Sequence, residues 1–327
     1  MTGVQTCALP ICRTGLFAAF GWTPRESLRA VVVQFFGSAN PFARLVALAA
    51  CSQHRVDPDL GPLHILEDTD PAVRARAYRM AGELGRREFV SRLGAAAHVE
   101  EAACQFWAAW AAVLLGDRRD ALEALARFAA VPNSFRDRAL PLVLQAMSVA
   151  AGHDLLRSMT QDPAELRMVI RGSGWVGDPR YVPWLIGFMG HDALARIAGE
   201  AFTLITGLNG SAWLDLERLP PGRLESGPND DPNDPNVDMN EDDGLPWPDA
   251  MKVQVWWNAN AQRFQPGMRY FMGQPLNRDN CLRVLKEGFQ RQRIAAALYL
   301  SLLNPGTPLF EWRAPARRQQ RLLAQMS

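Results

Sequence analysis

One segment of the sequence matches a nucleotide-binding motif. Residues 172–177 read GSGWVG and fit the pattern GxGxxG. Such a motif binds pyrophosphate when it follows a parallel strand and opens a helix, because the backbone N–H groups then face the phosphates. Here helical periodicity surrounds the motif, and Pro179 and Pro183 interrupt the helix that would bind the phosphates. We therefore interpret the glycines as a turn between two helices and predict no cofactor.

Acidic residues near position 240 have part of the spacing of a calcium-binding loop. Asp238, Asn240, Asp242 and Asp249 match four ligand positions of an EF-hand. However, Asp243 occupies the place where that loop needs glycine, and an aspartate replaces the bidentate glutamate. The five histidines are scattered, and no cysteine pair has the spacing of a zinc knuckle. We predict no metal site, and whether the acidic segment binds a cation stays open.

A dense polar and aromatic turn is the strongest candidate for partner binding. Its residues are Trp175, Asp178, Arg180 and Tyr181. Asp178 has an alternative role, because Asp followed by Pro is typical of a helix N-terminus, where the carboxylate caps free N–H groups. The second-choice residues are three arginines nearer the C-terminus: Arg269, Arg291 and Arg293. Such arginines also suit a solvated face or pairing with the acidic segment. No GxSxG, P-loop or cysteine signature is present, so we predict no catalytic residues.

The charge is balanced overall but unevenly distributed. The chain has 35 basic and 34 acidic residues, a net charge of +1. Residues 220–244 carry eight acids, one base and five prolines, whereas residues 245–327 carry twelve bases and four acids. A protein that binds nucleic acid or a membrane by charge alone needs a large positive surplus, so both partners are disfavoured. Five cysteines are too few for a disulfide scaffold and favour a reducing compartment, which suggests the cytoplasm.

The elements that must position these residues are helices. Apolar residues recur at helical spacing from residue 23 to residue 208, and the most apolar run, 106–115, is too short to span a bilayer. Gly85, Gly116, Gly177 and Gly207 follow helical blocks at intervals of 31, 61 and 30 residues. A glycine there can take the left-handed conformation that closes a helix. Helix pairs of this length bury their apolar faces only by stacking, so the period predicts an all-α fold, an α-solenoid.

Two resemblances extend this prediction. Residues 177–186 (GDPRYVPWLI) and 70–75 (DPAVRA) resemble the short HEAT-like repeats first recognised in bilin lyases, over about residues 23–208. That resemblance implies an α/α superhelix that binds a protein on its concave face, although the unit near residues 134–160 departs from the pattern. Several further segments are similar to an uncharacterised proteobacterial HEAT-repeat family whose genes tend to lie beside type VI secretion spike genes. They are residues 175–185 (WVGDPRYVPWL), 196–202 (RIAGEAF), 245–248 (LPWP), 256–257 (WW), 269–270 (RY), 290–293 (QRQR) and 318–321 (RQQR).

The sequence predicts four regions. Residues 1–12 resemble translated sequencing adapter and are expected to be an artefact. Residues 13–219 are predicted to form HEAT-like helical repeats, and residues 220–244 an acidic, irregular linker. Residues 245–327 are predicted to form a basic, aromatic-rich C-terminal region with helices at 249–264, 277–287, 290–303 and 315–325.

The leading functional hypothesis is a non-enzymatic scaffold or adaptor that binds another protein. The second resemblance implies that this partner is a secretion spike or effector component. The alternative is a HEAT-like enzyme or DNA-binding protein, of the lyase or base-excision glycosylase type, that uses the solenoid groove. That alternative needs a concave face with arginines, a buried carboxylate and an aromatic wall.

Overall fold

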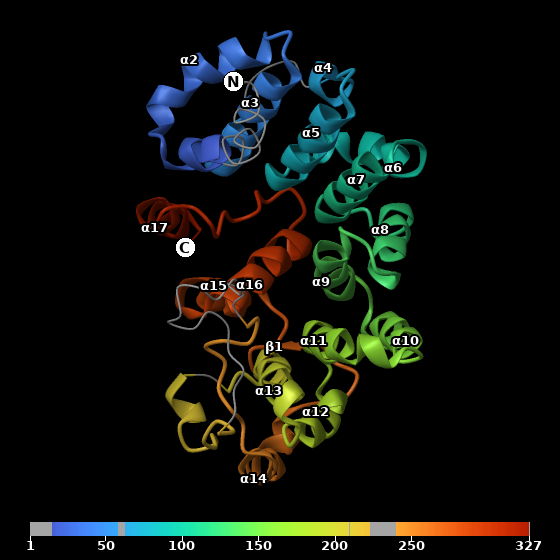
Figure 1. Cartoon of the computed structure of the whole chain (residues 1–327), viewed down its shortest axis with the longest axis vertical. Helices are drawn as coiled ribbons and strands as arrows, with labels where there is room; N and C mark the ends of the chain where they lie inside the picture. The colour runs from blue at the N-terminus through green and yellow to red at the C-terminus, as the bar shows by residue number, and fades with distance from the viewer. Residues whose placement is uncertain (1–14, 58–62, 209, 223–239, 327) are drawn as a thin grey trace, which may run out of the picture. The chain divides into compact units, whose positions relative to one another are not determined.

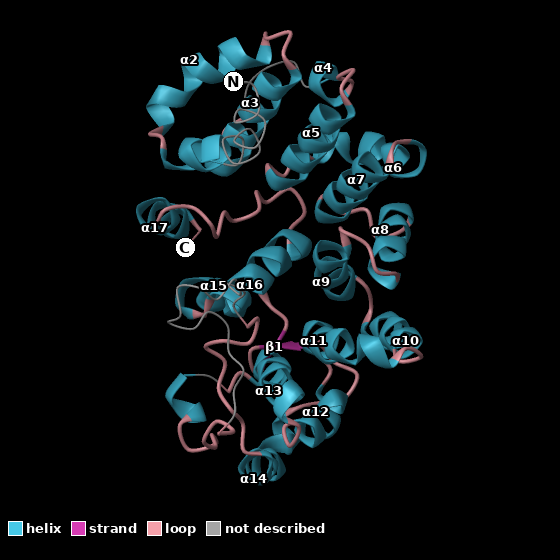
Figure 2. Cartoon of the chain, in the orientation of Figure 1, coloured by secondary structure: helices cyan, strands magenta, loops and turns pink. Residues whose placement is uncertain are grey.

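The computed structural model describes residues 15–57, 63–208, 210–222 and 240–326, and this part of the chain is an all-α solenoid (Figures 1 and 2). Its only strands in these ranges are β1 (Tyr270–Phe271) and β2 (Gln274–Pro275), a short antiparallel pair. The contacts divide the chain into two units, which we describe separately. Unit 1 comprises Met1–Ala146 with Cys281–Ser327, and unit 2 comprises Met147–Asn280.

Unit 1 stacks its helices in two rows. The first row packs α3 (Pro41–His54), α5 (Pro71–Glu83), α7 (Ala102–Leu114) and α9 (Arg136–Ala146) in sequence. The second row contains α2 (Arg25–Phe36), α4 (Leu63–Leu66), α6 (Val90–Val99) and α8 (Asp120–Ala130), with the 3-10 turn η1 (Arg87–Phe89) before α6. The C-terminal helices α15 (Arg278–Glu287, which starts at the unit boundary), α16 (Gln290–Leu303) and α17 (Ala316–Gln325) complete the unit. Helix α16 packs against α7 and α9, so the end of the chain covers the first row.

Unit 2 repeats this arrangement with fewer helices. Helix α11 (Leu166–Val176) packs between α10 (Val149–Met159) and α13 (Asp192–Thr206), and α12 (Val182–Phe188) packs on α13 and α14 (Ala250–Asn260). Short 3-10 turns link these helices: η2 (Pro163–Glu165), η3 (Pro179–Tyr181), η4 (Gly210–Trp213) and η5 (Ala261–Arg263). Its core joins Ile170, Leu185, Ile197 and Phe202, all fully or almost fully buried.

Aspartate caps start helices where the sequence predicts them. The carboxylate of Asp70 accepts hydrogen bonds from the N–H groups of Ala72 and Val73. Asp162 and Asp178 cap the turns η2 and η3 in the same way, and a proline follows each of them. These bonds satisfy N–H groups that the first helical turn leaves free.

Glycines end helices in both units and also permit close packing. Gly85, Gly116, Gly177 and Gly207 all have positive φ, which confirms the predicted left-handed conformation. Three residues before Gly85, a Cβ on Gly82 would lie 2.7 Å from the Cα of Ala111 in α7. Three residues before Gly177, a Cβ on Gly174 would lie 3.0 Å from the Cα of Ala201 in α13. Each unit therefore has two glycines three residues apart. The first allows close contact between helices, and the second ends the helix.

A returning backbone segment crosses these helix ends in each unit. In unit 2 the return segment, residues 265–276, donates the Tyr270 N–H to the carbonyl of Gly177 at 2.8 Å and the Met272 N–H to that of Leu204 at 2.7 Å. In unit 1 the return segment, residues 304–310, donates the Leu309 N–H to the carbonyl of Glu83 at 2.9 Å. Carbonyls that a helix C-terminus leaves free thus find partners far along the chain.

Two sequence-based predictions change in the light of these contacts. Residues 172–176 of the GSGWVG motif lie inside α11, and only Gly177 forms the turn, because Gly172, Ser173 and Gly174 are small residues buried in helix packing. The segment 245–327 is divided between the units, since its first part packs with α12 and its last part with α7 and α9. The divergent unit near residues 134–160 contains the boundary between the two units. Residues 1–14 and 223–239 lie outside the described ranges, so the predicted adapter segment and most of the linker do too.

We expect Gly177→Ala to destabilise unit 2 by about 2–4 kcal/mol, because it combines a left-handed backbone with a contact that leaves no room for a methyl group. A Cβ at this position would lie 3.4 Å from the carbonyl carbon of Tyr270 and closer still to its oxygen. Urea unfolding followed by circular dichroism measures the change. Gly187→Ala in α12 is the matched control, because nothing lies within 4 Å of its added Cβ. Equal stabilities of the two variants would contradict the proposed role of Gly177.

Candidate functional site

Asp178 lies at the centre of the predicted turn and is fully buried. Its carboxylate accepts the N–H of Arg180 at 2.9 Å, which is the capping bond, and the N–H of Gly267 from the return segment at 3.1 Å. It also accepts a hydrogen bond from Nε2 of His153 in α10 at 2.9 Å. Asp178 therefore caps the turn η3, and the same carboxylate joins three separate segments of unit 2.

His153 links Asp178 to Tyr181. Because Nε2 donates to the carboxylate, Nδ1 is left to accept the hydroxyl proton of Tyr181, which lies at 2.7 Å. Burial, and then the negative charge of Asp178, raise the pKa of Tyr181 to about 12. Carboxylate, imidazole and hydroxyl follow the order of a nucleophilic triad, but Asp178 is at the same time the acceptor for the N–H groups of Arg180 and Gly267. We interpret the three groups as a positioning network for the turn.

The other predicted residues of unit 2 lie around this network. Arg269 donates to the carbonyls of Val176 at 3.1 Å and Met147 at 2.9 Å, so it holds the return segment against α11 and α10. Trp175 is half-buried in α11, and the guanidinium of Arg171 lies 5.6 Å from its ring centroid. Of these residues Arg180 is exposed to solvent, whereas Trp175 and Tyr181 are half-buried.

Helix α12 extends Tyr181 into an aromatic stripe. One face of the helix buries Val182, Leu185, Ile186 and Met189 in the core of unit 2. Beside that face lies the aromatic stripe, which we define as Tyr181, Trp184, Phe188 and His191. Tyr181 ends η3 and His191 follows α12, and the rings of Tyr181 and Phe188 also pack against the same core. Successive ring centroids in this stripe are 6.2, 4.8 and 6.0 Å apart, and Trp184 and His191 are exposed. Because the rings contact one another and the network of Asp178 fixes the first of them, the stripe is a rigid, partly exposed aromatic surface.

Sequence reasoning missed most of this stripe. The spacing of positions 181, 184, 188 and 191 is a helical face, and it was present in the sequence. However, the interleaved positions 182, 185, 186 and 189 are apolar as well. With apolar residues on both faces, periodicity does not tell which face is buried.

The two remaining predicted arginines, Arg291 and Arg293, belong to unit 1, whereas the turn belongs to unit 2. Arg293 donates from Nε to the carbonyl of Leu285 at 2.8 Å and from an Nη to Gln319 at 2.5 Å. Its guanidinium also lies 5.9 Å from the ring centroid of Phe310. It therefore ties α15, α16 and α17 together. Arg291 is half-buried in the first turn of α16.

Helix α17 docks on α3 through an arginine and a histidine. Nε2 of His54 lies 2.8 Å from the carbonyl of Phe20, so it donates there, and Nδ1 accepts from Arg318 at 2.6 Å. Arg318 also donates to the carbonyl of Gly21 at 2.5 Å. Burial lowers the pKa of His54, and the positive charges of Arg318 and Arg25 lower it further. The contact therefore needs a neutral imidazole.

The acidic residues 241–243 pair with arginines of unit 2, and Asp249 has a different role. Asp242 accepts from Arg167 at 2.5 Å, and Asp243 pairs with Arg196 at 3.2 Å. Asp249 caps α14. These three residues thus serve different segments, and no group of three or more His, Cys, Asp or Glu side chains in the described ranges is arranged to hold a metal ion.

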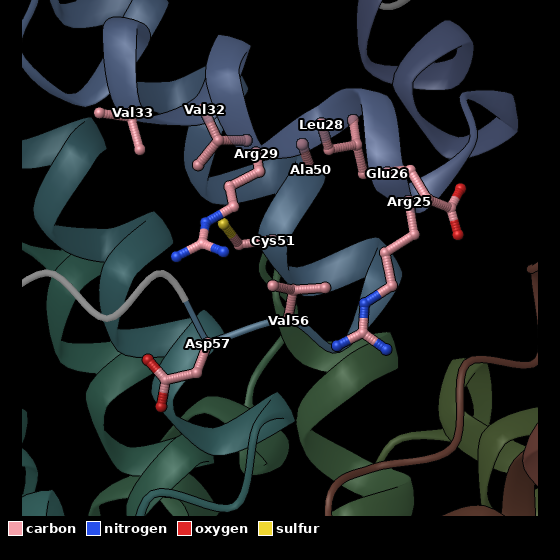
Figure 3. Close-up of a pocket in the computed structure, with 10 residues that line it drawn as sticks. All are labelled: Arg25, Glu26, Leu28, Arg29, Val32, Val33, Ala50, Cys51, Val56 and Asp57. Carbon is pink, nitrogen blue, oxygen red and sulfur yellow. The ribbon is translucent and has the colours of Figure 1, made fainter.

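A cavity of about 730 Å³ lies between α2 and α3 (Figure 3). Arg25 and Arg29 reach from α2 along its wall, and Val56 and Asp57 lie opposite them. The one thiol in the wall, Cys51, is buried, and burial raises its pKa to about 12. Because the thiolate is the reactive form, this cysteine is not a nucleophile at neutral pH.

The comparisons with known proteins support the repeats. The family model of HEAT repeats matches residues 61–145, all within unit 1, which supports a HEAT-like repeat protein. No curated protein and no solved structure matches the chain. HEAT repeats generally mediate protein–protein interaction, so a protein partner is compatible with these helices. In the described ranges, none of the helices has both the length and the apolar character needed to cross a bilayer.

We expect Asp178→Ala to destabilise unit 2 by about 2–4 kcal/mol, because it removes the buried carboxylate that accepts N–H donors of two segments and of His153. Asp162→Ala is the matched control, since Asp162 is exposed and caps a similar turn with one bond, to the N–H of Ala164. Loss of such an exposed cap costs about 1 kcal/mol. Urea unfolding measures both, and a cost for Asp178→Ala no larger than that for Asp162→Ala would contradict the network.

We expect unit 1 to lose stability as the pH falls below the ordinary histidine pKa of about 6.5. The pKa of His54 is lowered in the folded state, so the unfolded chain binds the proton more readily, and the stabilisation present above pH 6.5 is lost toward acid. Chemical unfolding at pH 7.5 and 5.5 measures the loss. His54→Gln should reduce this pH dependence, while the exposed His98→Gln should leave it unchanged. Identical pH dependence in all three proteins would refute the role of His54.

Proposed function

We propose that the protein is a non-enzymatic adaptor that binds another protein through the aromatic stripe of α12. The observation that carries this proposal is the rigid surface made by Tyr181, Trp184 and Phe188 beside the exposed Arg180. Tryptophan, tyrosine and arginine are the residue types that contribute most to protein–protein affinity. Aromatic rings that already contact one another lose little conformational entropy on binding, which favours such a surface further.

The environment of the stripe supports a binding role over a purely structural one. Trp184 leaves 36% of its surface exposed, although the same helix buries three aliphatic residues. Phe188 is half-buried, so a partner would cover both rings from one side. The positioning network gives the turn a defined conformation before binding. Asp178 and Arg269 act in this proposal by fixing the turn, and Trp175 borders it.

For the partner, we propose a spike or effector component of a type VI secretion system in the bacterial cytoplasm. The resemblance of residues 175–185 to the family encoded near spike genes supports this context, and these residues include part of the stripe. Arg291 and Arg293 would contribute by holding the end of the chain in place, and Arg291 could also meet an acidic surface of the partner.

The alternative function, a HEAT-like enzyme or DNA-binding protein, depends on unit 1. Such a function requires arginines, a buried carboxylate and an aromatic wall on a concave face. In unit 1, Arg76 pairs with the buried Glu83, and other arginines lie over the ring of Trp107. However, Glu83 is surrounded by arginines, and the end of the chain covers the first row of helices. A gel shift with a short duplex at low salt tests this alternative directly.

We expect Trp184→Ala to reduce partner capture at least tenfold, because truncation of a central aromatic residue typically costs about 2 kcal/mol or more. The experiment is a pull-down from a native host with the tagged full chain, followed by mass spectrometry and titration with the purified spike or effector protein. Met251→Ala is the matched control, because Met251 is an apolar residue, 81% exposed, on another helix of the same unit.

Two outcomes would count against different parts of this proposal. Equal capture by Trp184→Ala and the wild-type chain would exclude the stripe as the binding surface. Stripe-dependent capture of a protein that is neither spike nor effector would leave the adaptor in place and refute the secretion context. Circular dichroism of each variant separates these outcomes from misfolding.

A further inference from the structure

Unit 1 contains a cavity of about 510 Å³ where the end of the chain meets the first row of helices. Its walls come from residues 17–22, α3, α5 and residues 311–318. Four arginines line it, Arg76, Arg79, Arg313 and Arg318, together with Phe17 and Trp22. Cavities of this size typically hold small molecules. This cavity is independent of the aromatic stripe, which belongs to unit 2.

The two carboxylates in the wall are already neutralised. Glu83 is 3% exposed and lies 2.8 Å from Nε of Arg79 and 3.4 Å from an Nη of Arg76. Burial alone would raise the pKa of Glu83, but the nearby guanidinium groups outweigh it and hold the pKa far below its usual range. Glu311 pairs with Arg55, outside the wall, at 3.3 Å. Glu83 is therefore ionised, and both carboxylates are paired with arginines.

Three further arginines at this place have no carboxylate partner. In the part of the chain that the structure describes, Arg138, Arg313 and Arg318 form no ion pair with an aspartate or glutamate. Arg138 and Arg79 lie 5.6 and 4.6 Å from the ring centroid of Trp107, so positive charges also accumulate beside the cavity. Nε of Arg318 is buried without a hydrogen-bond partner.

The burial of these arginines, together with their proximity to one another, lowers the pKa of two guanidinium groups. Burial lowers the pKa of Arg138, and repulsion from Arg79 and Arg313 lowers it further. Burial lowers the pKa of Arg76 to about 10. Positive charges that are partly removed from water and close to each other destabilise the folded state unless an anion compensates them.

We propose that this cavity binds a small phosphorylated molecule, with Arg313 and Arg318 as its principal ligands to phosphate. Guanidinium groups bind phosphate through paired, charge-assisted hydrogen bonds, and the surplus of arginines over carboxylates suits a multiply charged anion. Phe17 and Trp22 offer an apolar wall for the rest of the molecule. Arg318 lies beside Arg313 in the wall, and its two Nη groups also donate to His54 and to the carbonyl of Gly21.

The test is isothermal titration calorimetry of the full chain with inorganic pyrophosphate, at constant ionic strength. We expect binding that weakens with added sodium chloride. Arg313→Ala should weaken it about tenfold, the usual effect of losing one charge-assisted hydrogen bond. Arg313 suits this test because it is exposed and forms no ion pair, so its loss should leave folding intact. Arg317→Ala is the matched control, an exposed arginine four residues further on that does not line the cavity.

Each result decides the proposal. Pyrophosphate binding that Arg313→Ala weakens and Arg317→Ala preserves supports it. No binding, or equal effects of the two substitutions, overturns the site. Citrate bound more tightly than pyrophosphate would overturn phosphate as the ligand class. A short DNA duplex bound more tightly, again through Arg313, would assign the arginines to nucleic acid instead and overturn the small molecule. Thermal unfolding without ligand confirms that each variant is folded.

Discussion

The fold depends on the close passage of a returning backbone segment over the ends of stacked helices. At Gly177 and Gly85 this passage leaves no room for a side chain, and backbone hydrogen bonds from Tyr270 and Leu309 satisfy the helix ends. A stack of helical hairpins is otherwise built from contacts between neighbours in sequence. The return segments add long-range contacts that close each stack. They also help to build both candidate sites. In unit 2, Gly267 of the return segment donates to Asp178, and in unit 1 the return segment leads directly into residues 311–318, which line the cavity.

The sequence alone predicts what is determined locally. Aspartate caps, the glycine period and the C-terminal helices depend on a few neighbouring residues, and the helix predicted at 290–303 has the observed bounds. The return segments could not be predicted, because their partners are backbone groups, which leave no side-chain signature, and they lie far away in the chain. The same limit explains why residues 245–327 look like one region in sequence but contribute to two units. Asp178 was identified as a candidate, yet its bonds to His153 and Gly267 depend on that same long-range packing.

Near-zero net charge conceals two local arrangements of opposite character. In unit 2, Asp242 and Asp243 pair with Arg167 and Arg196 of the repeats, so these acids are not available to the arginines near the C-terminus. In unit 1, Arg55, Arg76 and Arg79 pair with Glu83 and Glu311, the two carboxylates in the wall of the cavity of about 510 Å³, whereas Arg138, Arg313 and Arg318 form no ion pair in the described ranges. The net charge of the sequence therefore says little about binding, because a ligand responds to the local arrangement of charges in the folded protein.

The position of Arg318 links the proposed phosphate site to the docking of α17. The same guanidinium lines the cavity and donates to His54 and to the carbonyl of Gly21. A bound phosphate would attract this guanidinium, and a protonated His54 would repel it. Occupancy of the cavity and docking of the helix must therefore change each other's free energy by equal amounts, as linkage requires. If phosphate binding is strongest where His54 is neutral, the docked helix is the form that binds. If acid leaves binding unchanged while α17 loosens, Arg313 and the arginines of α5 suffice for the ligand.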